Sequence, residues 1–345
     1  MNLLSDARLV QRALRSKWTS AAGPFKLTAA VTYTCHQRCR HCRIWKRDSK
    51  DELSAGEWRQ IWRSVSSSLS WLDLTGGEVT NRPDFVEIAI AALEECPSLT
   101  LLHYPSNGSL PRQLEAVTRA IHSAGSQRLI LSISLDGPEK LHNKLRGDKS
   151  AFDNAVDSFQ RVKGLGVDVY FGMTLSSWNL DSVDETVEAL ARRIPGFGWR
   201  DLHINVMNES PHFFGNTGIK KPVGTDVAVT IEHLLRKRGR PRTKTELLEY
   251  LFLRRVPEHL ETGRSPMPCQ SMRGHAFVNP QGLVYPCHIW DRPVGSLRDH
   301  QYSLGRLWAS HEAQKTRDEV SNNHCPGCWT PCEAYPTILA NLPRI

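Results

Sequence analysis

The sequence lacks the features of membrane, secreted and fibrous proteins. None of its 345 residues lies in an apolar run approaching the roughly 18 residues of a membrane-spanning helix. The N-terminus carries Asp6 and Arg8 where a signal peptide has its apolar core, so we expect no export by that route. No repeat or low-complexity segment is visible, and 40% hydrophobic with 23% charged residues is ordinary for a globular chain. We therefore expect a cytoplasmic protein of two domains, or one large α/β unit with an appendage.

Cysteine is too scarce for a disulfide scaffold, and its distribution is uneven. Cys96 stands alone after an apolar helical stretch and is interpreted as a core or helix-end thiol. The other eight of the nine cysteines form two groups: Cys35, Cys39 and Cys42, then Cys269, Cys287, Cys325, Cys328 and Cys332. This grouping, without a signal peptide, indicates metal or iron–sulfur chemistry in a reducing compartment.

Short β-type runs alternate with amphipathic stretches from residue 26 to about residue 206. The predicted strands are Lys26–Thr34, Ser70–Leu74, Leu99–Tyr104, Arg128–Leu135, Asp168–Leu175 and Asp201–Val206. The predicted helices lie near 54–66, 83–95, 110–123, 151–164 and 180–192, with start signals at Ser54 and Asp181. Such alternation predicts a parallel sheet. Six units are too few for a closed eight-stranded barrel, so we expect an open, partial (β/α)6 barrel of the TIM type.

The pattern changes after the sixth predicted strand. Residues 207–222 are predicted to be a loop, followed by helices near 223–237 and 244–255. From Pro266 onward the chain is rich in Pro, Gly and Cys, and lacks the apolar content for a core of its own. We therefore predict an N-terminal helix (1–24), a partial barrel (25–215), a helical linker (216–264) and a small metal-organised domain (265–345).

The first cysteine group, Cys35-x₃-Cys39-x₂-Cys42, directly follows the first predicted strand. A structural zinc site wants four ligands, and no fourth lies close by in sequence. Three thiolates on a four-iron cluster leave one iron open to an outside ligand.

This spacing resembles the radical SAM superfamily, in which the open iron binds S-adenosylmethionine. Further motifs at strand ends strengthen the resemblance: Gly76-Gly77-Glu78 is similar to the GGE motif, Ser106-Asn107-Gly108 to TNG, and the run from Ser134-Leu-Asp136-Gly-Pro through His142 to Arg146-Gly to SxDGPxxxHxxxRG. Residues Gly172–Asn179 match a fifth element more loosely. Val79 and His41 depart from the usual Pro and aromatic residue, and neither change removes a ligand.

The resemblance implies the residues that bind the cofactor. Glycines allow a close backbone approach, a carboxylate can take the ammonium of the methionine moiety, and an Arg fork suits its carboxylate. The SAM-binding residues implied in this way are Gly76, Gly77, Glu78, Asn107, Ser134, Asp136 and Arg146.

The second cysteine group is similar to the SPASM/twitch domains of one radical SAM subfamily. Five cysteines are too few for the two clusters of a full SPASM domain, so a single auxiliary [4Fe–4S] cluster is implied. The C-x₁₇-C and C-x₂-C spacings match relatives that oxidise aminocyclitols and assign Cys269, Cys287, Cys325 and Cys328 as ligands, with zinc as the alternative. Cys332 is left as an alternative ligand, a hydrogen donor to a substrate radical, or an inert thiol.

Other candidate substrate contacts lie around the sixth strand. His203 and Asn205 alternate on that strand, so both are expected to point into the barrel, either as contacts to S-adenosylmethionine or substrate or as hydrogen-bonded barrel residues. In the following loop, Asn208, Glu209 and His212 are candidates, with ordinary loop polarity as the alternative. The catalytic candidates are thus Cys332, Glu209 and His212.

The implied reaction is reductive cleavage of S-adenosylmethionine to a 5′-deoxyadenosyl radical, which abstracts a substrate hydrogen. An auxiliary cluster that accepts the remaining electron gives a net oxidation, so dehydrogenase-type chemistry is the first expectation. The alternatives are a peptide maturase or epimerase, although no leader-binding domain fits the first 25 residues, and a lipid-modifying enzyme. An iron–sulfur redox sensor that binds DNA is the non-enzyme alternative.

Charge and amphipathicity indicate partners only weakly. The net charge is +8, and part of the basic excess, His36–Arg47, lies beside the proposed cluster of anionic thiolates. Arg238-Gly-Arg-Pro-Arg242 resembles an AT-hook core, but a solvated turn between helices is favoured over nucleic acid. The amphipathic N-terminal helix is expected to pack across the barrel base rather than on a membrane surface. The expected partners are a small-molecule or peptide substrate and a reductase, flavodoxin or ferredoxin that supplies electrons.

Overall fold

The computed structural model describes residues 3–18, 23–125 and 128–342, and its strands form one nine-stranded sheet. The order is β6-β5-β4-β3-β2-β1-β7-β8-β9; all pairs from β6 to β7 are parallel, and the pairs β7–β8 and β8–β9 are antiparallel. The strands are β1 (Lys26–Thr32), β2 (Trp71–Gly76), β3 (Leu101–Ser106), β4 (Leu129–Ser134), β5 (Asp168–Leu175), β6 (Leu202–Val206), β7 (His275–Val278), β8 (Leu283–Tyr285) and β9 (Gly295–Ser296). The sheet runs from β6 to β9 without closing, which confirms the partial barrel.

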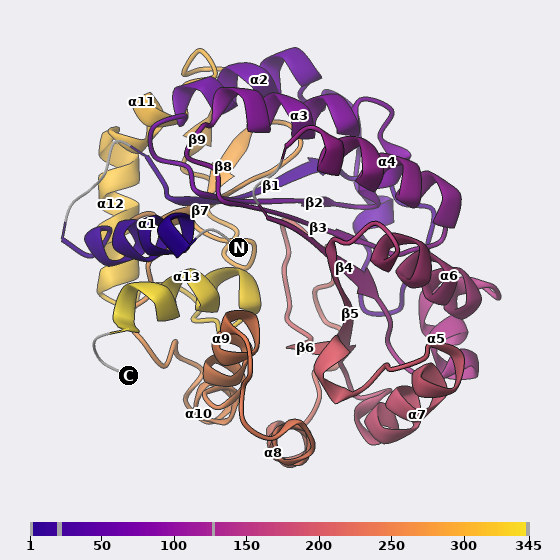
Figure 1. Ribbon diagram of the computed structural model, residues 1–345. Helices are drawn as coiled ribbons and strands as arrows, with labels where there is room; N and C mark the ends of the chain where they lie inside the picture. The colour runs from indigo at the N-terminus through magenta and orange to yellow at the C-terminus, as the bar shows by residue number, and fades with distance from the viewer. Residues whose placement is uncertain (1–2, 19–22, 126–127, 343–345) are drawn as a thin grey trace.

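Helices cover both sides of this curved sheet (Figure 1). Those along its outer side are α2 (Ala55–Ser64), α3 (Phe85–Glu95), α4 (Pro111–Ser123), α6 (Ala151–Lys163) and α7 (Val183–Arg193). The remaining helices are α1 (Leu3–Arg15), α5 (Glu139–Arg146), α8 (Gly224–Arg238), α9 (Lys244–Leu253), α10 (Val256–Thr262), α11 (Leu304–Trp308), α12 (His311–Ser321) and α13 (Pro331–Asn341). Figure 1 shows α13, α9 and α1 on the concave side, opposite the outer helices.

The two faces of the barrel strands differ in polarity. On the outer face, Phe171 of β5 stacks on Phe159 of α6 with ring centroids 4.5 Å apart, and each such buried ring contributes about 1.5–3 kcal/mol. On the inner face, β4, β5 and β6 place Ser132, Tyr170 and His203 at alternate positions that keep accessible surface. The barrel therefore has an apolar shell and a polar inner wall.

The sequence located the barrel elements closely. All six predicted strands are confirmed to within two residues at each end, and so are the two helices expected after residue 222. Ser54 starts α2 as predicted, since its side chain accepts from the Glu57 amide while Glu57 bonds back to the Ser54 amide. The start signal at Asp181 is wrong: residues 180–182 form a 3₁₀ turn and α7 begins at Val183.

The C-terminal segment differs from its prediction. It contains α11, α12 and α13, and β7 pairs in parallel with β1, so that this segment extends the barrel sheet. Its apolar side chains, among them Met272, Leu307 and Trp308, belong to the same buried cluster as the barrel core. The sequence predicted that this segment lacks the apolar content for a core of its own. It did not predict that the segment would complete the core of the barrel. The predicted domain boundaries stay predictions.

The N-terminal helix α1 packs at the base of the barrel, as expected. The Arg12 guanidinium donates to the Ser68 carbonyl and the Ser70 hydroxyl, at 2.7 and 2.8 Å, and to the Ser98 hydroxyl at 3.0 Å. Ser70 and Ser98 lie just before β2 and β3, at the amino ends of the strands. Within the described ranges, no helix is long and apolar enough to cross a membrane.

Candidate active site

The three-cysteine loop lies beyond the carboxyl end of β1, where it is held by the end of α5. The Arg38 amide donates to the Arg146 carbonyl at 3.2 Å, and the Arg40 amide donates to the Leu145 carbonyl at 2.9 Å. The Arg146 side chain returns to the loop, with Nη1 3.7 Å from the Cys39 sulfur. The fold thus brings Arg146 and the cysteines together, as the sequence predicted.

The three thiols occupy a desolvated and mutually repulsive setting. Burial raises the pKa of Cys35 to about 11 and the pKa of Cys42 to about 12, and charge on the neighbouring thiols adds to both shifts. Burial also raises the pKa of Cys39, although the Arg146 guanidinium opposes that shift. A metal centre is what stabilises three adjacent thiolates in such a place, because metal binding displaces thiol protons.

Gly76 and Gly77 allow the end of β2 to approach the backbone that leads into the cysteine loop. A Cβ atom on Gly76 would lie 2.2 Å from the Thr32 carbonyl oxygen, and one on Gly77 would lie 2.3 Å from that of Thr34. The Gly77 and Glu78 amides donate to the same two carbonyls, at 2.7 and 2.9 Å. The predicted close approach is therefore to the protein's own backbone, which positions the loop.

The Glu78 carboxylate is occupied by protein donors. One oxygen accepts from the Thr80 hydroxyl and from the Ser106 hydroxyl, both at 2.8 Å, and the other accepts from the Asn107 amide at 2.6 Å. The residue is 1% exposed. This geometry gives no support to the expectation that Glu78 takes the ammonium of the methionine moiety; instead, Glu78 ties the loop after β2 to the loop after β3.

Asp136 and Arg146 form a buried ion pair beside the cysteines, with Arg146 Nη2 2.8 Å from Asp136 Oδ2. Burial alone would raise the pKa of Asp136, but Arg146, with smaller contributions from His41 and His142, outweighs burial and lowers it. His142 Nδ1 accepts from the Asp136 amide at 2.9 Å, and burial and then Arg146 lower the pKa of His142 to about 3. The neutral imidazole and the ion pair together hold the loop after β4 against α5.

Several buried polar atoms in this region have no hydrogen-bond partner among the described residues. They are Gln37 Nε2 in the cysteine loop, Asn107 Nδ2 after β3, and Arg146 Nε. Ser134, at the end of β4, is half-buried at the same edge of the sheet. Unpaired buried donors are costly and rare, so a ligand with acceptor groups fits between these loops. The residues present therefore suit an iron–sulfur cluster with bound S-adenosylmethionine.

The second cysteine group assembles around a cavity of about 240 Å³ in the C-terminal region. Its lining includes the four cysteines assigned from spacing, which are Cys269, Cys287, Cys325 and Cys328. The Ser271 amide donates to the Cys269 sulfur at 3.4 Å, and the Trp290 amide donates to the Cys287 sulfur at 3.3 Å. Four converging thiols with backbone donors to sulfur suit an auxiliary cluster.

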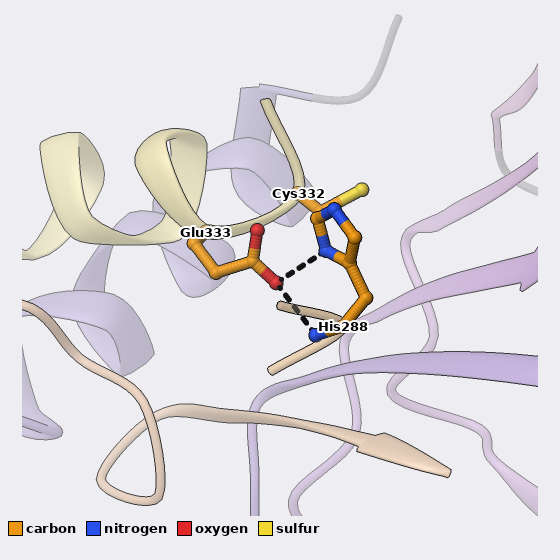
Figure 2. Close-up of side chains that lie close together, drawn as sticks. All are labelled: His288, Cys332 and Glu333. Atoms are coloured by element: carbon orange, nitrogen blue, oxygen red, sulfur yellow. Dashed lines mark hydrogen bonds and ion pairs between the residues drawn. The ribbon is translucent and has the colours of Figure 1, made fainter. Parts of the chain in front are cut away.

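Cys332 lies outside the lining of that cavity, at the start of α13. Figure 2 shows the His288 imidazole between the Cys332 sulfur and the Glu333 carboxylate. One ligand atom from each of the three side chains lies within 4.8 Å of the others, and His288 Nδ1 is 2.9 Å from Glu333 Oε1. Burial opposes ionisation of Glu333, but His288, His275 and Lys26 together more than offset it and bring the pKa to about 2. Lys26 Nζ of β1 donates to the Cys332 carbonyl at 2.8 Å and so ties the start of α13 to β1.

The loop candidates after β6 are engaged in contacts within the protein. His212 is buried and stacks on Tyr285 at 4.1 Å, and its Nε2 lies 3.1 Å from the Cys287 carbonyl oxygen. Burial and then His288 lower the pKa of His212 to about 3. Glu209 accepts from the Gly218 amide at 2.9 Å, and Asn208 donates to the Val206 carbonyl at 2.7 Å. These side chains order the loop and join it to the auxiliary region.

The basic turn after α8 is also used internally. Arg238 Nη1 lies 3.1 Å from Glu249 Oε2, and Arg238 Nε donates to the Trp199 carbonyl at 3.0 Å. His203 of β6 points to the same carboxylate, with its Nε2 3.4 Å from Oε2. The first arginine of the AT-hook-like run is therefore a packing residue, which weakens the nucleic-acid alternative.

Sequence reasoning missed a group of polar side chains on the inner wall. Lys26 of β1 is fully buried and pairs with Asp73 of β2, with Nζ 2.8 Å from Oδ2. Asp73 Oδ1 lies 3.2 Å from Nδ1 of His103 on β3. The sequence did contain a sign of this group, because charged or polar residues occur at alternate positions of otherwise apolar strands, as in Trp71-Leu-Asp73-Leu.

Comparison with protein families agrees with this geometry. A model described as the radical SAM superfamily matches residues 30–190, and the SPASM model, described as an iron–sulfur cluster-binding domain, matches residues 269–329. The chain belongs to the radical SAM superfamily and carries a SPASM-type domain. It is an enzyme of that class, whose cofactors are S-adenosylmethionine and [4Fe–4S] clusters.

Individual relatives are distant but extend over most of the chain. The sporulation killing factor maturation protein SkfB of Bacillus subtilis is 22% identical over 88% of this chain and 69% of its own length. A PqqA peptide cyclase of Methylobacterium sp. (strain 4-46) is 25% identical over 92% of this chain and 83% of its own. An AdoMet-dependent heme synthase of Methanosarcina barkeri is 25% identical over 86% of both chains.

Solved structures share the fold. Streptococcus suis SuiB bound to S-adenosylmethionine superposes with a TM-score of 0.63 at 15% identity, covering 86% of this chain and 68% of its own. The structure of anSMEcpe with bound AdoMet gives a TM-score of 0.61 at 14% identity, covering 93% of this chain and 98% of its own. At these identities the similarity establishes the fold.

Proposed function

We propose that this radical SAM enzyme modifies a peptide. The observation that carries the proposal is the similarity to a PqqA peptide cyclase over 92% of this chain. The maturation protein SkfB is similar over 88% of the chain. These relatives favour the peptide maturase alternative over the dehydrogenase-type expectation on a small molecule.

The roles of the cysteines follow from their placement. Cys35, Cys39 and Cys42 hold the cluster that binds S-adenosylmethionine, with Asn107, Ser134 and Arg146 beside the cofactor. When bound, this cofactor pair supplies a 5′-deoxyadenosyl radical for hydrogen abstraction. The four cavity cysteines hold the auxiliary cluster, and Cys332 stays a thiol. Iron analysis tests the last point: Cys332→Ala keeps about eight irons per chain, and a fall to about four would make Cys332 a ligand.

The protein's contribution is to position the substrate and to exclude water. The curved sheet and α13, on its concave side, flank the polar inner wall, where a peptide segment would lie (Figure 1). Nine free cysteines suit a reducing compartment, for which we propose the cytoplasm.

Electrons for the reaction come from a protein donor of the flavodoxin or ferredoxin class. Arg38, Arg40, Arg43 and Lys46 are exposed on and directly after the three-cysteine loop, which suits an acidic carrier. Replacing Lys46 by Glu is expected to slow reduction by flavodoxin and not by dithionite. Equal slowing with both reductants contradicts this docking site.

Mass spectrometry of small peptides tests the proposed function. Peptides are compared between the source organism and a strain whose copy carries Cys35→Ala, Cys39→Ala and Cys42→Ala. Cross-linking or cyclisation appears as a peptide lighter by two hydrogen atoms, and epimerisation as a shifted retention time at unchanged mass. If the two strains yield identical peptides, the proposal fails.

Oxidation of a small molecule is the second candidate. It draws on the similarity to a protein named AdoMet-dependent heme synthase, whose named product is not a peptide. The same pair of strains distinguishes the candidates, because a difference confined to the non-peptide metabolites favours the second.

A further inference from the structure

Three adjacent strands place a carboxylate, an imidazole and a hydroxyl in one hydrogen-bonded row on the inner wall. Asp73 of β2 and His103 of β3 are register partners, and Ser132 of β4 pairs with Pro105, two residues beyond His103. Asp73 Oδ1 lies 3.2 Å from His103 Nδ1, and His103 Nε2 lies 2.9 Å from Ser132 Oγ. The backbone register therefore sets the spacing of the row.

Asp73 is an anchored carboxylate. One of its oxygens lies 2.8 Å from Lys26 Nζ, and the other accepts from Trp71 Nε1 at 2.8 Å. Burial opposes ionisation, but Lys26 and then His103 lower the pKa of Asp73. An ionised carboxylate only accepts hydrogen bonds, so Asp73 favours the His103 tautomer that carries its proton on Nδ1.

This tautomer leaves a lone pair on His103 Nε2, which accepts from the Ser132 hydroxyl. The His103 side chain is 25% exposed, whereas that of Asp73 is 9% exposed. Lys26 and Trp71 already give each Asp73 oxygen a partner. The fold therefore does not need His103 to neutralise this carboxylate or to supply a missing hydrogen bond. A carboxylate that orients a partly exposed imidazole is the arrangement of a general base.

Aromatic rings continue the wall beside this base. Tyr170 of β5 is the register partner of Ser132, and it stacks on His203 of β6 with centroids 4.1 Å apart. A peptide segment lying on this surface would have its polar groups next to the row. We propose that His103 is a catalytic base of the enzyme and that Asp73 is its positioning residue, an inference that rests on the proposed peptide modification.

The step assigned to His103 is a proton transfer during bond formation within the peptide. Joining a C–H carbon to an X–H group, where X is the sulfur, oxygen or nitrogen of a peptide residue, removes two protons and two electrons in total. Hydrogen abstraction removes one proton with one electron, and the auxiliary cluster that the four cavity cysteines would hold would accept the second electron. The second proton leaves X as the carbon–X bond forms, and it passes to His103 Nε2.

The test uses the reconstituted, full-length enzyme. Its substrates are the peptides smaller than about 10 kDa, which is below the size of a typical domain, from the strain with the triple cysteine replacement. His103→Gln keeps polar bulk and removes the base. We expect the yield of peptide lighter by two hydrogens, per 5′-deoxyadenosine released, to fall at least about a hundredfold. His122→Gln, the same change on the exposed face of α4, is the matched control and leaves this yield unchanged.

Chemical rescue separates a base from a structural residue. His103→Ala leaves space on the inner wall, and added imidazole is expected to restore product in proportion to its concentration. Ser132→Ala is expected to retain product, since the hydroxyl only satisfies the resting lone pair. Failure of imidazole to rescue overturns the proposal, and so does a loss in Ser132→Ala equal to that in His103→Gln.

The outcomes also separate this inference from the proposed function. If the wild-type enzyme alters no peptide, the proposed function fails, and the role of His103 as a base fails because it rests on that function. If the wild-type enzyme cross-links a peptide and His103→Gln does so with equal yield, only the base is overturned.

Discussion

The two cysteine groups are assembled in different ways. Cys35, Cys39 and Cys42 lie within eight residues on one loop, which backbone bonds to α5 hold in place. The four cavity cysteines come from three separate segments, which meet because β7 pairs with β1 and the C-terminal helices join the barrel core. A local motif specifies the first site, whereas the second exists only once the chain has folded.

Their electrostatic surroundings differ as well. The Arg146 guanidinium lies beside Cys39, while the auxiliary side has the Glu333 carboxylate, whose charge raises the pKa of Cys328 and Cys269 further. A cation close to thiolates favours their ionised form, and an anion disfavours it. We therefore expect the two groups to respond differently to substitution.

The largest effect is expected from removing the first group. Replacing Cys35, Cys39 and Cys42 by Ala should lower 5′-deoxyadenosine release with dithionite at least about a hundredfold and halve the iron content, because no other described group holds that cluster. Replacing Cys325 and Cys328 by Ala should also halve the iron but leave release within about tenfold. Equal loss of release in both variants contradicts the division of roles.

Next in size is the loss of the buried ion pair on the first side. Arg146→Met leaves the Asp136 carboxylate buried without its guanidinium, which typically costs about 3–5 kcal/mol in unfolding free energy. Denaturant unfolding measures the change. The control is Arg161→Met, which breaks more exposed ion pairs to Glu115 of α4 and Asp157 of α6 and should cost far less. Similar costs for both would show that burial of the pair does not matter.

A smaller effect is expected from closing the space beside the first loop. Gly77→Ala places a Cβ against the Thr34 carbonyl, and overpacking of this kind costs about 1–3 kcal/mol. Gly56→Ala in α2 meets nothing within 4 Å and should be neutral or stabilising by about 1 kcal/mol. Thermal unfolding of the two variants gives the comparison, and a neutral Gly77→Ala would refute the close-approach argument.

The smallest effect concerns pH. His142 has a pKa of about 3 in the folded chain, against about 6.5 when unfolded, so between these values the unfolded chain binds more protons. Its contribution to stability is complete above pH 6.5 and falls by roughly 1.4 kcal/mol per pH unit below that. His142→Gln should flatten the slope by this amount in unfolding experiments between about pH 4 and pH 5.5, where the folded chain leaves His142 neutral and the unfolded chain protonates it. An unchanged slope would mean that His142 is protonated in the folded state.

Local patterns predicted the barrel well because its strands and helices repeat at short range. Ser54 and Glu57 signal the start of α2 within four residues, and alternation marks β5 and β6. Glu78 was assigned to the cofactor because its motif was visible, whereas its hydrogen-bond partners at Ser106 and Asn107 lie on another loop. The residue types therefore located the site, but the local sequence did not show which groups bind the Glu78 carboxylate.

Sequence alone determined the class of this protein, the first cluster motif and most of the barrel. Only the tertiary structure decided that β7 extends the sheet, that four cysteines share a cavity without Cys332, and that Asp73, His103 and Ser132 form one row. The reason is distance along the chain: strand register and helix packing bring together residues separated by tens to hundreds of positions. No periodicity within a single segment carries that information.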